Sequence, residues 1–415
     1  MGCRLNHAEG AAIRGALEEA GHEVSVGGDG AGADAFVLHT CAVTAAAQTE
    51  ALRHLRAARR AGARRIVVCG CAASVADEAA LREAGADEIV SRRAPAPPAG
   101  SLAALVADAL GRPLAHRPSL FSTRAPVKVQ DGCSFRCSYC IVPDARGAPR
   151  SRPFADVLAE ARGLLARGFR ELVLTGVNVA CWREGDRSFA DLARAVAALP
   201  GLGRVRISSI EPHTAEREIV DLMAAPGSKL CPMLHYPLQS GSDRVLRAMR
   251  RRYTAAEYRA AVERALALVP GLGLGADIIT GFPGETDADF EETVRLVRDY
   301  PFSNLHVFPY SERPGTPAAS MPGAVPVRVR RDRAKALIAL GEEKRAAFAA
   351  TFAGREAEVL VERVGEDGVA EGWTGPYLRA RLPGRTAADI GALLRARVAA
   401  VEGDGLLLAG GTAAP

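Results

Sequence analysis

Apolar runs and amphipathic stretches alternate along the first quarter of the chain. Short apolar runs lie at 35–38 and 66–68, and stretches with apolar residues at helical spacing lie at 9–20 and 44–61. This alternation is typical of α/β units, in which each strand is followed by a helix. The proline-rich stretch 95–98 then ends the pattern. The first segment is therefore predicted to be a small α/β domain.

The central part of the chain repeats the alternation more regularly. After a helix-like stretch at 102–110 and an irregular linker at 111–125, strand-like runs lie around Val127 and at 172–174, 205–207, 233–236, 276–279 and 305–308. Helical patterns lie between them, for example at 157–166, 189–198 and 290–298. Such a series of β/α units predicts a partial parallel (β/α)6 barrel. By analogy with the full barrel, the C-terminal ends of its strands form one reactive rim.

The tail has a different pattern. From 356 to 408, alternating runs separated by glycine-rich turns predict a small all-β barrel. The chain is thus predicted to be an α/β protein with an N-terminal domain at 1–112, a central barrel at 119–350 and a β-barrel at 354–411.

Three cysteines follow the first strand of the predicted central barrel. Cys133, Cys137 and Cys140 have the spacing CxxxCxxC, and Gly132 opens their loop. Three thiolates on one tight loop can hold three irons of a 4Fe-4S cluster and leave the fourth iron open for a substrate or cofactor. A structural zinc site needs four ligands, and no Cys or His follows within about a dozen residues of Cys140. The spacing therefore predicts a redox cluster rather than zinc.

The sequence around these cysteines resembles a known family. The run GCSFRCSYCIVPDARG, followed by LTGVN, RISSIEP, LHYPLQSGSDRVLRAMRRRYT, GADIITGFPGETDADFEET and HVFPYSERPGTPAA, resembles the radical S-adenosylmethionine methylthiotransferases over nearly the whole chain. RISSIEP, MRRRYT and FPYSERPGTPAA are most similar to the bacterial tRNA threonylcarbamoyladenosine methylthiotransferases. Sister groups act on isopentenyl-adenosine in tRNA or on an aspartate of a ribosomal protein.

The resemblance implies S-adenosylmethionine and two 4Fe-4S clusters as cofactors. The CxxxCxxC triad would hold one cluster, and Cys3, Cys41 and Cys71 match the GCxxN, NTC and GC contexts of the auxiliary cluster. His39 stands where the family usually has Asn, which would change the hydrogen bonding around that cluster. The family also has a strand before the first of these cysteines. We therefore expect Cys3 at a frayed terminus and a weakly held auxiliary cluster, unless the start lies further upstream. The remaining cysteines are interpreted as structural: Cys69, Cys181 and Cys231.

Polar residues and glycines follow the predicted barrel strands at one rim. By resemblance, the residues expected to bind S-adenosylmethionine are Thr175, Gly176, Asn178, Ser209, Glu211 and Gln239. Gly281, Gly284 and Glu285 follow the fifth strand at the same rim. Asp277 lies within its strand and fits either an inward position or a buried structural carboxylate. The candidate acid or base groups, each of which is more often hydrogen-bonded structure than catalyst, are His213, His235 and His306.

Charge is concentrated in the middle of the chain. The segment 113–354 holds 34 of the 53 basic and 26 of the 48 acidic residues, a net charge of +8, whereas the flanks are slightly acidic. Its basic runs are candidate RNA phosphate contacts or solvated helix faces, and they comprise Arg247, Arg250, Arg251 and Arg252, then Arg328, Arg330, Arg331, Arg333 and Lys335. In the tail, where the family has an RNA-binding TRAM domain, the candidates for stacking and phosphate contact are Trp373, Tyr377, Arg379 and Arg381. The two aromatic residues fit the core of the small barrel equally well.

The sequence also bears on compartment and reaction. No window approaches the length of a membrane span and the start lacks a signal pattern, so we expect a cytoplasmic protein with no membrane partner, whose nine cysteines are not disulfide-bonded. The resemblance implies that S-adenosylmethionine is cleaved to a 5′-deoxyadenosyl radical, because an aromatic C–H bond resists acid, base and nucleophile chemistry. Sulfur carried on the auxiliary cluster would then join carbon 2 of threonylcarbamoyladenosine next to the anticodon, and a second S-adenosylmethionine would supply the methyl group.

The expected partners are the tRNA anticodon loop, an electron donor protein and a sulfur donor. Two alternatives remain from the sequence. One is methylthio transfer to isopentenyl-adenosine or a ribosomal protein. The other is a non-catalytic iron-sulfur protein that binds RNA.

Overall fold

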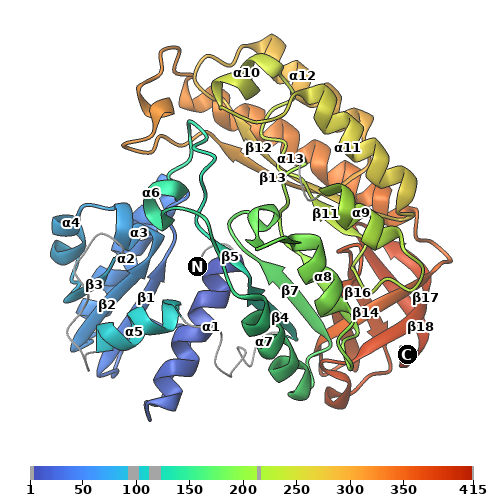
Figure 1. The fold of residues 1–415 in the computed structure, drawn as a ribbon, viewed down its shortest axis with the longest axis horizontal. Coiled ribbons are helices and arrows are strands. Elements are labelled where there is room, and N and C mark those ends of the chain that lie inside the picture. The colour runs from blue at the N-terminus through green and yellow to red at the C-terminus, as the bar shows by residue number, and fades with distance from the viewer. Residues whose placement is uncertain (1–3, 92–101, 112–122, 213–215, 414–415) are drawn as a thin grey trace.

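Three bodies lie side by side in the structure: an N-terminal α/β layer, a central arc of parallel strands covered by helices, and a C-terminal β-barrel (Figure 1). This computed structural model describes residues 4–91, 102–111, 123–212 and 216–413. The predicted fold class is confirmed. Most of the linker predicted at 111–125 lies outside the described residues.

The N-terminal layer is a parallel sheet in the order β1-β2-β3, with helices on both faces. Its elements are α1 (Arg4–Glu19), β1 (Ala35–Thr40), α2 (Ala45–Arg60), β2 (Arg65–Gly70), α3 (Cys71–Val75), α4 (Glu78–Glu83), β3 (Glu88–Val90) and α5 (Leu102–Gly111). Because side chains alternate along a strand, Val67 and Cys69 pack against α1 and α5, while Ile66 and Val68 pack against α2 and α4. A strand buried on both faces reads as a continuous apolar run, which is why the sequence revealed it.

The central arc is built from two three-stranded parallel sheets, β10-β7-β4 and β11-β12-β13. The strands are β4 (Arg124–Lys128), β7 (Glu171–Thr175), β10 (Arg204–Ile207), β11 (Met233–His235), β12 (Gly273–Thr280) and β13 (Phe302–Pro309). At the seam, the Val205 N–H donates to Lys229 O at 2.8 Å and the Cys231 N–H donates to Val205 O at 2.8 Å. Together the sheets form the predicted partial barrel.

Helices cover the outer face of this barrel, and the main core lies between them and the strands. The helices are α7 (Phe154–Ala166), α8 (Phe189–Ala197), α9 (Glu216–Ala224), α10 (Asp243–Ala248), α11 (Ala255–Leu268), α12 (Asp287–Asp299) and α13 (Val327–Ala350). Capping boxes begin α8, α11 and α12, formed by Ser188 with Asp191, Thr254 with Glu257 and Thr286 with Asp289. Each such cap satisfies free N–H groups and is worth about 1 kcal/mol. Smaller elements on the connections are β5 (Gln130–Asp131), α6 (Val142–Arg146), β6 (Arg150–Ser151), η1 (Val179–Cys181), β8 (Arg183–Glu184), β9 (Arg187–Ser188) and η2 (Pro317–Ser320).

The C-terminal barrel closes in the order β14-β15-β16-β18-β17. Its elements are β14 (Glu356–Val364), β15 (Val369–Thr374), β16 (Arg379–Pro383), η3 (Ala387–Asp389), β17 (Leu393–Glu402) and β18 (Gly405–Ala413). It docks against the N-terminal ends of the central strands, opposite the rim. A side chain at Gly273 would place its Cβ 2.2 Å from Pro376 O, so the contact requires glycine there.

A buried ion network joins the two barrels. Glu171 accepts hydrogen bonds from Arg204 at 2.6 Å and Arg206 at 2.8 Å. The same guanidinium groups donate to backbone oxygens of the small barrel: Arg204 to Trp373 O, and Arg206 to Thr374 O and Gly375 O. The small barrel therefore covers the N-terminal ends of the strands of the partial barrel.

Trp373 and Tyr377 lie at this junction. Their rings stack with centroids 4.5 Å apart, and the Arg206 guanidinium lies 5.0 Å from the Tyr377 ring. Neither residue belongs to the core of the small barrel, so that interpretation was wrong. Both are half-buried where they meet the central domain.

Several arginines of the two basic runs are buried, contrary to both interpretations made from the sequence. Arg330 and Arg333 are buried and paired with Glu312 and Glu285, and the Arg251 side chain is only 4% exposed. These three cannot contact RNA phosphates, so that prediction was wrong for them. The members that do lie exposed are Arg247, Arg250, Arg252, Arg328, Arg331 and Lys335.

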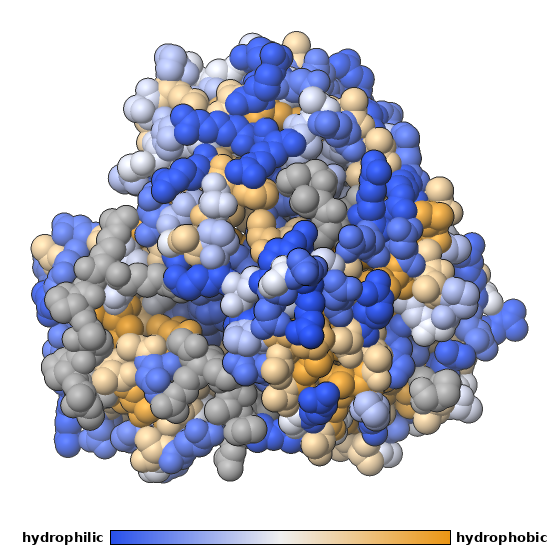
Figure 2. All heavy atoms as spheres, viewed as in Figure 1, coloured by the Kyte–Doolittle hydropathy of each residue, from blue (hydrophilic) through white to orange (hydrophobic). Residues whose placement is uncertain are grey.

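Hydrophilic side chains cover much of the face shown in Figure 2, and the apolar ones gather in separate patches. Among the described residues, no helix combines the length and apolar character needed to cross a membrane.

Candidate cofactor and substrate site

The cysteine loop leaves the barrel at the predicted rim, between β5 and α6. Cys133, Cys137 and Cys140 all lie on this loop, and Cys140 N–H donates to Cys137 O at 3.0 Å. Gly132 has φ +74°, and a Cβ there would lie 2.1 Å from Ala148 O. Only glycine fits this entry to the loop, because the Ala148 carbonyl leaves no room for a side chain.

All three thiols lie on one loop, so this loop alone can supply ligands to different irons of one cluster. A structural zinc site would need a fourth ligand, which the loop 133–140 does not contain.

The surroundings of the loop also favour a cationic partner. Burial raises the pKa of the Cys140 thiol to about 12, and burial also raises the pKa of Cys133. Thiolates at these positions need positive charge close by, which a metal cluster supplies. The residues present thus fit a 4Fe-4S cluster.

Arg251 ties the cysteine loop to the third strand end. It donates to Cys137 Sγ at 3.3 Å and to Glu211 at 2.5 Å, and it also contacts the Tyr139 hydroxyl at 3.4 Å. Glu211, which we expected to bind S-adenosylmethionine, is thus paired with a cation beside the cysteine loop. Sequence reasoning missed this role, because Arg251 stands in a run of arginines that reads as a solvated face.

Among the described residues, buried polar side chains without hydrogen-bond partners follow both β7 and β10. Asn178 is 5% exposed, and among the described residues neither its Nδ2 nor its Oδ1 finds a hydrogen-bond partner. Ser208 Oγ is buried and equally unsatisfied at the end of β10. Orphaned buried polar groups are costly, so their presence at the rim indicates a ligand that satisfies them.

The other predicted S-adenosylmethionine contacts lie on the same rim. Thr175 ends β7, and a Cβ on Gly176 would lie 2.9 Å from Gln130 O, which explains the glycine. Ser209 follows the unsatisfied Ser208 after the end of β10 and stands two positions before Glu211. Gln239, with φ +63°, donates its N–H to Asp277 O at 2.8 Å.

Two of the three predicted auxiliary ligands lie on neighbouring loops. Cys41 follows β1 and Cys71 begins α3 after β2, and the strands end in register at Thr40 and Gly70. Gly70 has φ +92°, and a Cβ there would lie 2.5 Å from Thr40 O. The third predicted ligand, Cys3, lies outside the described residues. Asn6, close to it in sequence, donates to Thr40 O at 2.8 Å, so the start of α1 is held at these loops.

Arg146 connects the auxiliary loops to the cysteine loop. It donates to Cys71 Sγ at 3.1 Å, to Glu9 at 2.8 and 2.9 Å, and to Asp131 at 3.0 Å. Burial alone would raise the pKa of Glu9, but the adjacent His39 and the hydrogen bonds from Arg146 hold it well below its usual range. His39, which replaces the usual Asn, therefore contacts Glu9, at 3.3 Å. Asp131 stands two positions before Cys133, so one arginine links both cysteine sets.

The remaining cysteines divide into two groups. Cys69 and Cys231 are buried, and burial raises the pKa of each thiol, as expected of structural residues. Cys181 on η1 is only half-buried, and its pKa is raised by burial and by the neighbouring Cys133 and Glu211. It thus lies beside the cysteine loop, which its isolated position in the sequence did not indicate.

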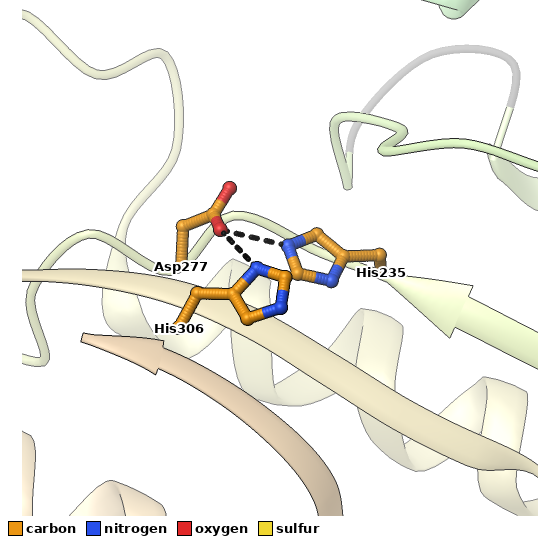
Figure 3. A group of neighbouring side chains, drawn as sticks. All are labelled: His235, Asp277 and His306. Atoms are coloured by element: carbon orange, nitrogen blue, oxygen red, sulfur yellow. Dashed lines mark hydrogen bonds and ion pairs between the residues drawn. The ribbon is translucent and has the colours of Figure 1, made fainter. Parts of the chain in front are cut away.

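Below the rim, three side chains meet on the inner face of the barrel. His235 Nε2 lies 3.0 Å and His306 Nδ1 lies 3.2 Å from Asp277 Oδ1 (Figure 3). Burial opposes ionisation of Asp277, but the two histidines hold its pKa well below the usual range. Asp277 is therefore inward and ionised. The third candidate histidine, His213, lies outside the described residues.

Comparisons with known proteins follow the same division of the chain. A model of the Radical SAM superfamily matches residues 127–297, and a model of the uncharacterized protein family UPF0004 matches residues 1–91. A tRNA-2-methylthio-N(6)-dimethylallyladenosine synthase of Novosphingobium aromaticivorans is 39% identical over 88% of this chain and 86% of its own length. A protein of the same name from Coxiella burnetii is 36% identical over 87% and 86%.

One similar solved structure is the radical S-adenosylmethionine methyltransferase TsrM of Kitasatospora setae, determined with cobalamin and a 4Fe-4S cluster bound. It aligns with a TM-score of 0.52 at 18% identity, over 69% of this chain and 65% of that one. At this identity the likeness concerns the fold alone.

Proposed function

Since the chain belongs to the radical S-adenosylmethionine methylthiotransferase family, we propose that it attaches a methylthio group to an N6-modified adenosine of tRNA. It is a transferase that uses 4Fe-4S clusters and S-adenosylmethionine. The observation that best supports the proposal is Arg146, which joins two separate cysteine sets within one buried network.

In this proposal Cys133, Cys137 and Cys140 hold the cluster that binds S-adenosylmethionine, and Cys3, Cys41 and Cys71 hold an auxiliary one. When bound, these groups supply one-electron cleavage of the sulfonium and the sulfur for transfer. We assign residues 119–350 to the cluster that binds S-adenosylmethionine, residues 1–112 to the auxiliary cluster and residues 354–411 to RNA contact.

The chain's own groups then have distinct tasks. Asn178 and Ser208, unsatisfied among the described residues, would receive the polar end of S-adenosylmethionine. Arg251 places a positive charge on Cys137 and fixes Glu211. The partial barrel encloses the reacting groups, which limits access of water to a reactive radical.

The N6-substituent has two candidates. The relatives reported above are named dimethylallyladenosine synthases, which favours an isopentenyl-type substituent. The strings RISSIEP and FPYSERPGTPAA favour threonylcarbamoyladenosine, for which the comparisons give no support. The place beside the anticodon, the electron donor and the sulfur donor remain predictions of the resemblance.

Mass spectrometry of tRNA nucleosides from a strain lacking the gene decides between them. Loss of the 2-methylthio form of dimethylallyladenosine, restored by the wild-type gene, would select the first candidate. Loss of the threonylcarbamoyl form would select the second. An unchanged set of methylthio nucleosides would contradict the proposed function.

A further inference from the structure

The inner face of β11, β12 and β13 carries a group of side chains that no cofactor role described above uses. The strand register places His235 beside Gly275 and Gly275 beside Asn304 in one row. Asp277 and His306 form the next row toward the rim, and Ile279 and Phe308 the row after that.

Several specific contacts hold the side chains of this group in place. His235 reaches Asp277 by crossing over Gly275, where a Cβ would lie 2.7 Å from His235 Nδ1. Asn304 Nδ2 lies 3.0 Å from the far nitrogen of His306. The Gln239 N–H donates to Asp277 O, so the group lies directly below a predicted S-adenosylmethionine contact.

The group also presents open binding surface. Both histidines share Asp277 Oδ1, and Figure 3 shows the other carboxylate oxygen turned away from both rings. The His306 side chain is 49% exposed and Phe308 is 42% exposed, with ring centroids 6.5 Å apart. Leu305, one position before His306, points to the opposite face and packs against Gly341 of α13, and Val307 between the two rings packs against the same core, so the exposed rings are on the inner side.

We propose that this group is the pocket for the target nucleobase: His306 and Phe308 stack on the base, and Asp277 accepts a hydrogen bond from its exocyclic N–H. An aromatic surface beside a hydrogen-bond acceptor is the combination that holds a base taken out of its stack. The three ligand atoms lie within 4.8 Å of one another, a spacing that also fits a divalent cation. The exposed Phe308 favours the base, because a cation gains nothing from it. The inference rests on the proposed function.

Binding to anticodon stem-loop RNA tests it on the anaerobic, cluster-loaded enzyme. Fluorescence anisotropy would compare an RNA carrying the N6-modified adenosine with the same RNA lacking the base at that position. Phe308→Ala and Asp277→Asn should each weaken binding of the modified RNA about tenfold, the size of one stacking contact or one hydrogen bond, and leave the abasic RNA nearly unaffected. Ile338→Ala on α13, with a similarly exposed apolar side chain, is the matched control and should bind like wild type.

The outcomes separate the inference from the function. If both variants keep the wild-type preference for modified RNA, the pocket assignment is overturned. If the purified wild type contains one zinc that His235→Ala loses while Phe308→Ala keeps the RNA preference, the group is a cation site and the assignment is again overturned. If wild type makes methylthio RNA but shows no preference, only the inference fails. If it makes none, the proposed function fails as well.

Discussion

Arg146 Nε lies 3.1 Å from Cys71 Sγ, and the same guanidinium holds Asp131 beside the cysteine loop. Replacing it by Ala leaves Glu9 buried without its main partner, at a cost of about 3 kcal/mol or more. We predict that Arg146→Ala loses the auxiliary cluster, so that iron falls from about eight to about four per chain. Arg150→Ala, which removes an exposed arginine 3.7 Å from Asp131, should keep the wild-type iron content.

The conservative variant separates charge from hydrogen bonding. Arg146→Lys keeps a cation near Glu9 but not the planar fork that reaches both Glu9 and Cys71. Hydrogen bonds to cluster sulfurs favour the reduced state, so the auxiliary potential should become more negative. Redox titration followed by electron paramagnetic resonance measures it. An unchanged potential would mean that Arg146 acts only on the fold.

Arg251 should matter far more than its exposed neighbour. We predict that Arg251→Gln strongly reduces reductive cleavage of S-adenosylmethionine, because Glu211 and Cys137 lose their shared cation. Arg252→Gln, which removes an exposed guanidinium 4.0 Å from the Phe135 ring, should retain most cleavage. The measurement is 5′-deoxyadenosine formed per reduced cluster. Equal losses in both variants would contradict the assignment.

Asn178 offers a test of ligand binding without a stability cost. Its side-chain amide makes no hydrogen bond among the described residues, so Asn178→Ala should not lower the free energy of unfolding. It should weaken S-adenosylmethionine binding about tenfold, the value of one or two hydrogen bonds. Isothermal titration on the cluster-loaded enzyme gives the affinity. Unchanged affinity with lowered stability would make the residue structural.

Glu171 should make docking of the small barrel sensitive to acid. Burial raises its pKa, but the guanidinium of Arg206, with that of Arg204, outweighs burial and holds the pKa at about 2, against an ordinary 4.5. A carboxylate whose folded pKa is depressed stabilises fully above about pH 4.5 and loses this contribution as pH falls toward 2. Glu171→Gln should therefore cost about 3 kcal/mol at pH 7 and clearly less near pH 3.5. Urea unfolding of cluster-free wild type and variant measures the difference, and an equal gap at both pH values would contradict this reading.

The strands, and the placement of Cys41 and Cys71 on neighbouring loops, were accessible from the sequence for physical reasons. Strands buried on both faces are continuous apolar runs, so β2 and β7 stood out. Parallel strands end at a common edge, so Cys41 and Cys71 could be expected to meet without any contact information.

Contacts between distant segments were not accessible in the same way. Arg251 and the exposed Arg252 are adjacent letters in one basic run, and only packing buries the first. Trp373 looked like a stacking or core residue because its docking partner, Arg204, stands far away in the sequence. His235 and His306 each looked like a lone histidine, since only strand register places His306 beside Asp277 and His235 beside Gly275, over which it reaches the same carboxylate.

Product analysis of one reaction tests the central claim most directly. The cluster-loaded enzyme would be given reductant, S-adenosylmethionine and anticodon stem-loop RNA, and the RNA and 5′-deoxyadenosine would be measured by mass spectrometry. We predict both methylthio RNA and 5′-deoxyadenosine from wild type, 5′-deoxyadenosine alone from Cys41→Ala/Cys71→Ala, and neither from Cys133→Ala/Cys137→Ala/Cys140→Ala. Methylthio RNA from the variant lacking Cys41 and Cys71, or its absence with wild type, would contradict the account.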